Sequence, residues 1–365
     1  MVHDIDTVLD TPTGDGVDPG EFIRAAMRWH FDRRTGSPFW LARARTLDFD
    51  PLTDVKGVDD LALFPNVCDE LRDVRVEDLV PRGYGDKPDV CGFFESGGTT
   101  GRPKRVVLLR DWFLKSQEWL SSSLDAHGVP RGVNWLTLLP SGPHMAGYAY
   151  PRLARDRGGH AFPIDMDPRW VKQLIASGRA EDARAYAGHL LEQARYLLRS
   201  QEVGVLAVTP PVLERIAVDD ELTELVRKKV KAIVWAGAHM DASTRDLLGG
   251  EVFPGLALIG FFGSTMMLHS CSPRVTEDAG ESVFDPPAPF ITFRVVDPDS
   301  RKQVDHGARG RVVVNHVSRS FLLPNNLDRD EATRVRGPRR QVGDSLADVT
   351  PVQVFDGEAV IEGVY

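Results

Sequence analysis

The sequence predicts an α/β fold in which mostly parallel sheets are flanked by helices and are followed by a β-rich C-terminal subdomain. From Asp89 onward, short apolar runs alternate with amphipathic helical patterns, which is typical of parallel strands joined by crossover helices. After Pro289 the helical patterns stop and strand-like runs follow one another. A chain of 365 residues with 42% hydrophobic residues is long enough to build such a core.

The predicted elements follow in a regular order along the chain. Residues 1–88 form a leader packed on the core, 89–288 the α/β core, and 289–365 a β-barrel-like subdomain. Apolar runs predict strands at 90–94, 105–109, 134–139, 204–208, 232–236, 256–261, 291–296, 311–317, 352–355 and 359–361. Helices are predicted at 112–127 with Asp111 as N-cap, at 168–201 with a break near Gly178, after Pro210-Pro211, at 221–231 and at 241–248.

Composition and charge exclude several classes of protein. The formal net charge is −9, which argues against nucleic-acid binding. Cys68, Cys91 and Cys271 lie far apart, so neither a disulfide framework nor a zinc cluster is indicated. The acidic start does not resemble a signal peptide, and the longest uncharged run, 252–273, contains proline and glycines that disfavour a membrane span. We therefore expect a soluble cytoplasmic protein that binds neither nucleic acid nor membrane.

One glycine-rich loop carries the strongest functional signal. It reads ESGGTTGRPK, from Glu95 to Lys104, between two predicted strands. Its glycines let backbone N–H groups converge, its threonines add hydroxyl donors, and Arg102 and Lys104 add positive charge, as a polyphosphate requires. It is not a Walker loop, because no GK[ST] occurs and a strand follows where a helix is needed. The alternative is a glycine-rich hairpin turn without a ligand, but such a turn needs far fewer residues.

This loop resembles the phosphate loop of the adenylate-forming superfamily, which includes acyl- and aryl-CoA ligases, peptide-synthetase adenylation domains and luciferases. The family usually has SGTTGxPK, and Gly97 stands where its serine is expected. Other segments resemble further family motifs in the right order: LPSGPHMAG at 139–147, WAGAH at 235–239, FFGSTM at 261–266 and GD at 343–344. The resemblance covers roughly 89–363 and is closest to the phenylacetate–CoA ligase and acyl-protein synthetase branches.

The resemblance implies a site for ATP and a carboxylic acid. It assigns the ribose hydroxyls to Asp344 and makes His144 the gate of the acid pocket. The implied nucleotide-binding residues are Ser96, Gly97, Gly98, Thr99, Thr100, Gly101, Lys104, Gly237, Ala238, Phe262, Gly263, Ser264, Thr265 and Asp344. The implied acid-binding residues are His144, Trp235, Ala236, Gly237 and Phe262, and the implied catalytic residues are Lys104, Thr100 and His144.

Several of these residues also have an interpretation in which they bind no ligand. Asp344 could belong to a solvated turn, and Trp235 could be a core residue at the end of an apolar strand. Phe261 and Phe262 alternate along a strand, so only one of them is expected to face a ligand. His269 and Cys271 are too few to indicate a metal site.

The chain departs from the family's pattern at two places. The family's Mg²⁺-binding glutamate is replaced by Met266, whose thioether is a weak ligand for a hard cation, so Mg²⁺ would be held by phosphates, water or another carboxylate such as Glu95. The sequence also ends at Tyr365, where the family's mobile C-terminal domain begins, and its last lysine is Lys302. The resemblance therefore implies that the mobile domain and its catalytic lysine are absent, and we expect slow formation of an acyl adenylate with little CoA thioester.

Together these patterns predict an acid ligase that uses ATP to activate an aromatic or otherwise compact carboxylic acid as an acyl adenylate. The acyl group would pass to an amine, a thiol or a carrier or partner protein. Two alternatives stay open: a non-catalytic nucleotide- or acid-binding module, and an acyl-protein synthetase subunit of a larger complex. The residues name neither the acid, the acceptor, the metal ligands nor the oligomeric state.

Overall fold

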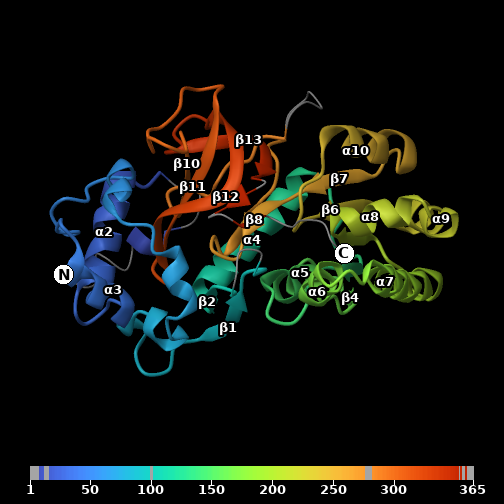
Figure 1. Ribbon diagram of the computed structural model, residues 1–365, viewed down its shortest axis with the longest axis horizontal. Helices are drawn as coiled ribbons and strands as arrows, with labels where there is room; N and C mark the ends of the chain where they lie inside the picture. Colours follow the sequence, from blue (N-terminus) through green and yellow to red (C-terminus); the bar gives the residue numbers. More distant parts are fainter. Residues whose placement is uncertain are drawn as a thin grey trace.

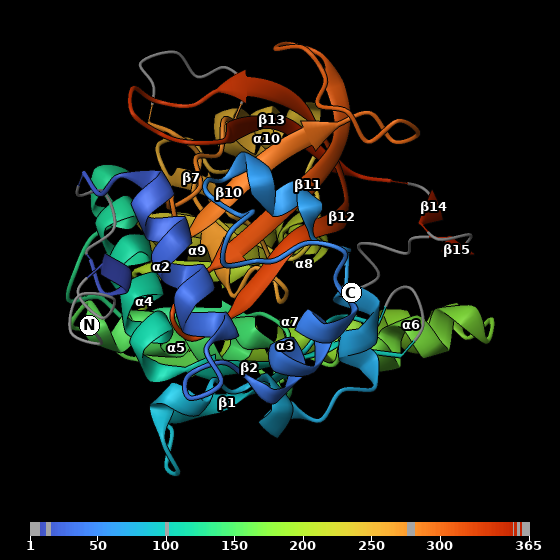
Figure 2. The ribbon, with the colours of Figure 1, turned by 90° about the vertical axis from the view of Figure 1, so that its left-hand side faces the viewer.

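A five-stranded parallel sheet and a closed antiparallel barrel lie side by side in the molecule (Figure 1). The computed structural model describes residues 8–11, 16–98, 102–275, 282–352, 354–355 and 358–359. Helices cover the sheet, and the N-terminal helices pack against the barrel side (Figures 1 and 2). The predicted α/β class with a β-rich C-terminal subdomain is thus confirmed.

The parallel sheet has the strand order β4-β3-β5-β6-β7, and each neighbouring pair is parallel. Leu136, Leu206 and Ile233 are fully buried in its centre. Such continuous apolar strands are typical of a sheet that is covered on both faces. The strands are β3 (Trp135–Leu138), β4 (Ala161–Pro163), β5 (Val205–Val208), β6 (Ala232–Trp235) and β7 (Ala257–Gly260).

The helices of this half lie close to their predicted positions, except α5, which was not predicted. Their bounds are α4 Arg110–Ala126, α5 Met145–Asp156, α6 Pro168–Ala176, α7 Ala180–Ser200, α8 Pro210–Ala217, α9 Asp220–Lys229 and α10 Ala242–Leu247. The predicted break falls at Gly178, whose φ of 74° ends α6. The predicted cap at Asp111 is wrong: α4 begins at Arg110, two residues before the predicted start, with Leu109 as N-cap. The Asp111 carboxylate instead accepts a hydrogen bond from the Tyr84 hydroxyl.

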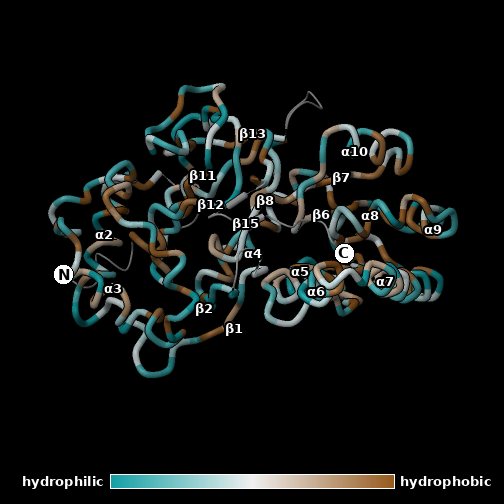
Figure 3. The backbone as a smooth tube through the Cα atoms, in the orientation of Figure 1, coloured by the Kyte–Doolittle hydropathy of each residue, from teal (hydrophilic) through white to brown (hydrophobic). Residues whose placement is uncertain are grey.

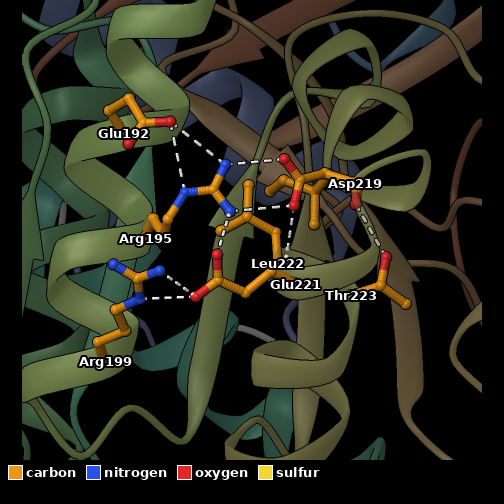
Figure 4. A network of polar contacts seen from close by, with 8 residues as sticks. Glu192, Arg195, Arg199, Asp219, Glu221, Leu222 and Thr223 are labelled. Atoms are coloured by element: carbon orange, nitrogen blue, oxygen red, sulfur yellow. Dashed lines mark hydrogen bonds and ion pairs between the residues drawn. The ribbon is translucent and has the colours of Figure 1, made fainter.

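A charged network joins α7 to α9 on the outer surface (Figure 4). Arg195 lies 2.8 Å from the Asp219 carboxylate and 2.9 Å from that of Glu221. The same Asp219 side chain caps α9 by accepting from the backbone N–H of Leu222. Apolar and polar residues recur along both helices, as Figure 3 shows, so one side of each faces the core. The network therefore fixes the positions of α7 and α9, which cover the sheet.

The barrel consists of β10 (Ile291–Val296), β11 (Arg309–Val317), β12 (Leu322–Arg336) and β13 (Asp344–Pro351), all antiparallel. The first two strands were predicted from their valine-rich runs. The longest strand, β12, was not predicted, because its middle is polar and lacks a β-branched or aromatic pattern. Its pairing with β11 shifts register twice, and such irregularities turn polar side chains out of the usual alternation.

The N-terminal segment is anchored to the barrel by two tryptophans. The indole N–H of Trp29 donates to the backbone carbonyl of Arg319 at 2.8 Å, and that of Trp40 donates to the carbonyl of Leu322 at 2.9 Å. Figure 2 shows α2 beside the barrel strands. The segment contains α2 (Pro19–Phe31), α3 (Pro38–Arg43) and the 3₁₀ turns Ala44–Thr46, Asp59–Leu63, Cys68–Arg72, Val76–Leu79 and Arg82–Tyr84.

Short hairpins connect the two halves and end the described chain. They are β1 (Val90–Glu95) with β2 (Arg105–Leu109), β8 (Phe262–Ser264) with β9 (His269–Cys271), and β14 (Val354–Phe355) with β15 (Glu358–Ala359). The predicted strand at 359–361 extends beyond the described residues. Within the ranges that the structure describes, no helix is both long enough and apolar enough to cross a membrane.

Candidate active site

The glycine-rich loop closes the β1–β2 hairpin at the centre of the molecule. The backbone N–H of Ser96 donates to the Lys104 carbonyl at 2.9 Å, and the Ser96 hydroxyl accepts from the Lys104 N–H at 3.0 Å. Gly98 has a φ of 64°, a conformation that favours glycine. The predicted phosphate ligands Thr99, Thr100 and Gly101 lie outside the described residues. The two described ends of the loop are thus held together.

Lys104 is held at the loop by an acidic neighbour. Its ammonium nitrogen lies 3.1 Å from Oδ1 of Asp69, and the side chain is 13% exposed. Burial acts to lower the pKa of Lys104, but Cys68 and Asp69 outweigh burial and raise it above its usual value. The amine is therefore charged at neutral pH and preoriented beside the loop.

Helix α6 adds two cations that the sequence analysis did not identify. Arg169 donates to the Ser96 carbonyl at 3.2 Å, and its guanidinium lies 2.8 Å from the Glu95 carboxylate. A Cβ built on Gly97 would lie 3.8 Å from the ammonium nitrogen of Lys172, so this lysine reaches the loop. The signal available in the sequence was Pro168, which fixes the start of α6 directly after a strand-to-helix loop, where ligands of α/β folds bind.

Beneath the loop lies a cavity of about 250 Å³, called here the central cavity. Charged side chains line it at the loop, and α4, α5, β9, β12 and the segments after β6 and β7 supply other parts of the wall. Its lining includes the predicted residues Ser96, Gly97, Gly98, Lys104, His144, Ala236, Gly237, Gly263, Ser264 and Thr265, together with Arg72, Lys172, Asp328 and Arg329. The structure therefore brings together predicted residues that lie as far apart as 96 and 265 in the sequence.

His144 forms part of the central cavity's wall at the start of α5. The side chain is almost buried, and burial, together with the nearby charges of Arg169 and Lys172, lowers the pKa of His144 to about 4. The imidazole is consequently neutral at pH 7. This position agrees with the predicted pocket wall and not with a histidine packed in a core.

A second cavity of about 200 Å³ lies against the carboxyl end of the parallel sheet. Trp235, Ala238, Phe261 and Phe262 line this second cavity, whereas Gly237, Gly263 and Arg329 line both cavities. Both phenylalanines border this cavity, and which of them faces a ligand stays a prediction. Phe261 lies between β7 and β8, where strict strand alternation is interrupted.

The predicted acid pocket is therefore divided between the two cavities. His144 and Ala236 line the central cavity, but Trp235 and Phe262 line the second one. The indole of Trp235 also covers Gly260, where an added Cβ would lie 2.2 Å from Cζ2 of Trp235. Trp235 thus combines a packing role with a place in the second cavity's wall.

Asp344 lines neither cavity, so the structure does not place it beside the other predicted nucleotide-binding residues. It is 3% exposed and lies inside the barrel. Its carboxylate accepts from the guanidinium of Arg334 at 2.8 Å, from the Gln303 amide at 2.8 Å and from the Val295 N–H at 3.2 Å. A carboxylate with these partners stabilises the barrel and has no free side for ribose hydroxyls.

Strand β12 carries other carboxylates that border the cavities. Asp328 lines the central cavity and Asp330 lines the second cavity. Arg329, which lies between them in the sequence, lines both cavities. Asp330 is half-buried. The sequence signal was an amide or acidic residue at every second position, Asn326, Asp328 and Asp330, within a polar stretch that was not recognised as a strand.

The residues present do not form a site suited to Mg²⁺. Met266 lines the central cavity with a thioether, and the Glu95 carboxylate is already within 2.8 Å of both Arg105 and Arg169. Mg²⁺ prefers oxygen ligands in octahedral geometry. Among the described residues, no group of three or more histidine, cysteine, aspartate or glutamate side chains could hold a metal ion. We therefore derive no chemical step through a protein-bound metal.

Comparison with known proteins relates this geometry to acid–CoA ligases. An open conformation of a 2-hydroxyisobutyryl-CoA ligase in complex with 2-HIB-AMP and CoA superposes with a TM-score of 0.65 at 15% identity, covering 96% of this chain and 80% of that one. The same ligase in a postadenylation state with R3-HIB-AMP gives a TM-score of 0.64 at 16% identity, covering 97% and 75%. No family model and no curated protein matches the sequence. The chain therefore has the fold of adenylate-forming ligases, established by structure and not by sequence similarity.

Proposed function

We propose that this protein is an acid ligase that uses ATP to convert a carboxylic acid into an acyl adenylate. The observation that carries the proposal is the junction of two cavities at Gly237, Gly263 and Arg329, directly beneath the glycine-rich loop. A nucleotide could span this junction, with its base and ribose in the second cavity and its phosphates in the central one. The acid would then occupy the central cavity beside the α-phosphate.

The base and ribose of ATP fit the chemistry of the second cavity. Phe262 offers an aromatic face, and Gly237 has a φ of 90° that lets the backbone turn at the cavity wall. Asp330 supplies a carboxylate that can accept both ribose hydroxyls. We therefore assign to Asp330 the ribose contact that was first expected of Asp344.

The reaction requires alignment and charge neutralisation more than acid–base catalysis. An oxygen of the ionised carboxylate forms a bond to the α-phosphorus, the bond to the bridging oxygen breaks, and pyrophosphate leaves with the electron pair. Lys104 and Lys172 would neutralise the phosphates near the loop. Neutral His144 would orient the acid without adding a charge. The solved 2-hydroxyisobutyryl-CoA ligase supports this scheme, since it binds such an adenylate, 2-HIB-AMP.

A binding module without turnover is the second candidate function. It is favoured by Met266 and by the arginine-paired Glu95, which leave the central cavity without an evident Mg²⁺ ligand set. A subunit that passes its acyl group to a carrier or partner protein would use the same site, so the acceptor, whether amine, thiol or protein, is part of the proposal.

Pyrophosphate release separates the two candidates. The purified chain is incubated with ATP, Mg²⁺ and a panel of compact acids, and pyrophosphate and acyl-AMP are measured. Acid-dependent release that is reduced ~10²–10³-fold in Lys104→Met, but not in the exposed control Lys228→Met, supports the ligase. Calorimetric binding of ATP without release for any acid supports the binding module.

A further inference from the structure

The wall of the central cavity contains polar side chains that a purely apolar acid would leave unsatisfied. On α4, Phe113, Ser116, Gln117 and Leu120 line the cavity, and their spacing puts them on one face of the helix. Gln117 is 4% exposed, and its carboxamide oxygen has no hydrogen-bond partner among the described residues. Burying such a group unpaired is unfavourable, and a leucine at this position would avoid that cost.

His269 on β9 provides a second unsatisfied group in the same wall. The ring is 1% exposed, and its Nδ1 lies 2.7 Å from the Ser116 hydroxyl. Its Nε2 is buried and has no partner within the described part of the chain. Ser116 therefore ties the imidazole to α4 next to Gln117, and both side chains line the cavity.

The imidazole is neutral and so presents one donor and one acceptor. Burial, and to a smaller extent the charge of His316, lowers the pKa of His269 to about 3. When the Ser116 hydroxyl donates to Nδ1, the proton of the ring resides on Nε2. The cavity then offers an N–H donor from His269 and a carbonyl acceptor from Gln117. A hydroxyl group can satisfy both, because it accepts one hydrogen bond and donates another.

We propose that the acid activated by this protein is a compact hydroxy acid whose hydroxyl group lies between Gln117 and His269. This inference rests on the proposed function, because it places the acid in the central cavity. The apolar neighbours Phe113 and Leu120 would pack against the carbon frame, while the hydroxyl group fixes its orientation. A site built to bind a hydroxyl group rejects the analogue without one, since its own polar groups then stay unpaired.

Matched acids test the proposal on the unmodified chain. Benzoate is compared with 2-, 3- and 4-hydroxybenzoate, and butyrate with 3-hydroxybutyrate, by acid-dependent pyrophosphate release and by calorimetric binding. At least one hydroxy acid should exceed its parent acid by about 100-fold or more in kcat/KM or affinity. Equal or better performance of the parent acids throughout would overturn the proposal and leave the ligase function standing.

Two variants identify the side chains responsible. Gln117→Met and His269→Phe should each reduce the preference for the hydroxy acid to less than about 10-fold, with unchanged affinity for ATP. The exposed residues Gln173 and His189 provide matched controls in Gln173→Met and His189→Phe, which should keep the full preference. A preference that survives in both cavity variants would show that other groups bind the hydroxyl. If no acid releases pyrophosphate, the ligase function fails, and the calorimetric preference alone decides whether the cavity selects hydroxy acids.

Discussion

Two buried histidines that flank Trp112 differ in how completely they are hydrogen-bonded. On the barrel side, His316 bonds through both ring nitrogens, Nδ1 to the Met267 carbonyl at 2.8 Å and Nε2 to the Ser318 hydroxyl at 2.8 Å. On the cavity side, His269 bonds through Nδ1 alone. A core satisfies its polar groups, whereas a binding site keeps some for its ligand. His316 is therefore a fully bonded core residue, whereas His269 keeps a ring nitrogen that, under the proposed function, a ligand in the central cavity would pair.

Removal of the Asp344 carboxylate should have the largest effect on stability. Asp344→Ala leaves the mostly buried Arg334 guanidinium and the Gln303 amide without their acceptor, so we expect the free energy of unfolding to fall by about 3–5 kcal/mol. Urea denaturation measures this, with the exposed Asp246→Ala as control. If Asp344→Ala instead binds ATP more weakly at unchanged stability, Asp344 belongs to the nucleotide site.

Acidification should destabilise the protein through its buried histidines. Burial lowers the pKa of His30 to about 4 and that of His316 to about 3, below the usual histidine pKa of about 6.5. Below pH 6.5 these histidines are protonated in the unfolded chain but stay neutral in the folded one. The free energy of unfolding is therefore highest above about pH 6.5 and falls as the pH is lowered to about 4. The loss is roughly 3 kcal/mol for each fully shifted histidine at pH 4.

Denaturation curves at pH 7 and pH 5 measure this loss. His30→Gln keeps a donor for the Ser318 carbonyl, which lies 2.7 Å from the histidine Nε2, but removes the titrating ring. It should therefore flatten the pH dependence. A variant as acid-sensitive as the original chain would contradict the assignment to His30.

Loss of the Asp330 carboxylate should weaken ligand binding. Asp330→Asn removes the charged acceptor for the ribose hydroxyls, and we expect ATP affinity to fall by ~1.5–3 kcal/mol. Asp348→Asn is the matched control, since Asp348 borders the same cavity but is exposed and accepts from the Thr333 hydroxyl. Equal losses in the two variants would mean that neither carboxylate is specific for ribose.

The smallest expected changes in stability test the comparison between His316 and His269. His316→Phe leaves the Met267 carbonyl and the Ser318 hydroxyl with fewer partners and should lower the free energy of unfolding by about 1–3 kcal/mol. His269→Phe loses one hydrogen bond but also removes an unsatisfied nitrogen, so its change should stay within about 1 kcal/mol. Thermal denaturation compares the pair, and the reverse order would remove the distinction between the core histidine and the cavity histidine.

The sequence predicted the parts of the molecule whose pattern is local. The alternating strands and helices, the glycine-rich loop and His144 could be found because periodicity and turn chemistry act over a few residues. The long strand β12 could not, because its polar residues face cavities that exist only after the barrel closes. The partners of Asp344 could not be predicted for a related reason: the Gly-Asp pair looks the same whether the carboxylate faces a ligand or Arg334. Gln117 and His269 carried no local signal, since α4 and β9 meet only in three dimensions.

The transfer of an oxygen atom from the acid to AMP tests most directly the proposal that this protein forms an acyl adenylate. The purified protein is incubated with ATP, Mg²⁺ and an accepted acid labelled with ¹⁸O in its carboxylate, and hydroxylamine is added to take the acyl group. Attack of the carboxylate on the α-phosphorus places one acid oxygen on the phosphate, so mass spectrometry should detect AMP carrying one ¹⁸O atom. Unlabelled AMP, or formation of ADP in place of AMP and pyrophosphate, would contradict an acyl adenylate formed where the two cavities meet.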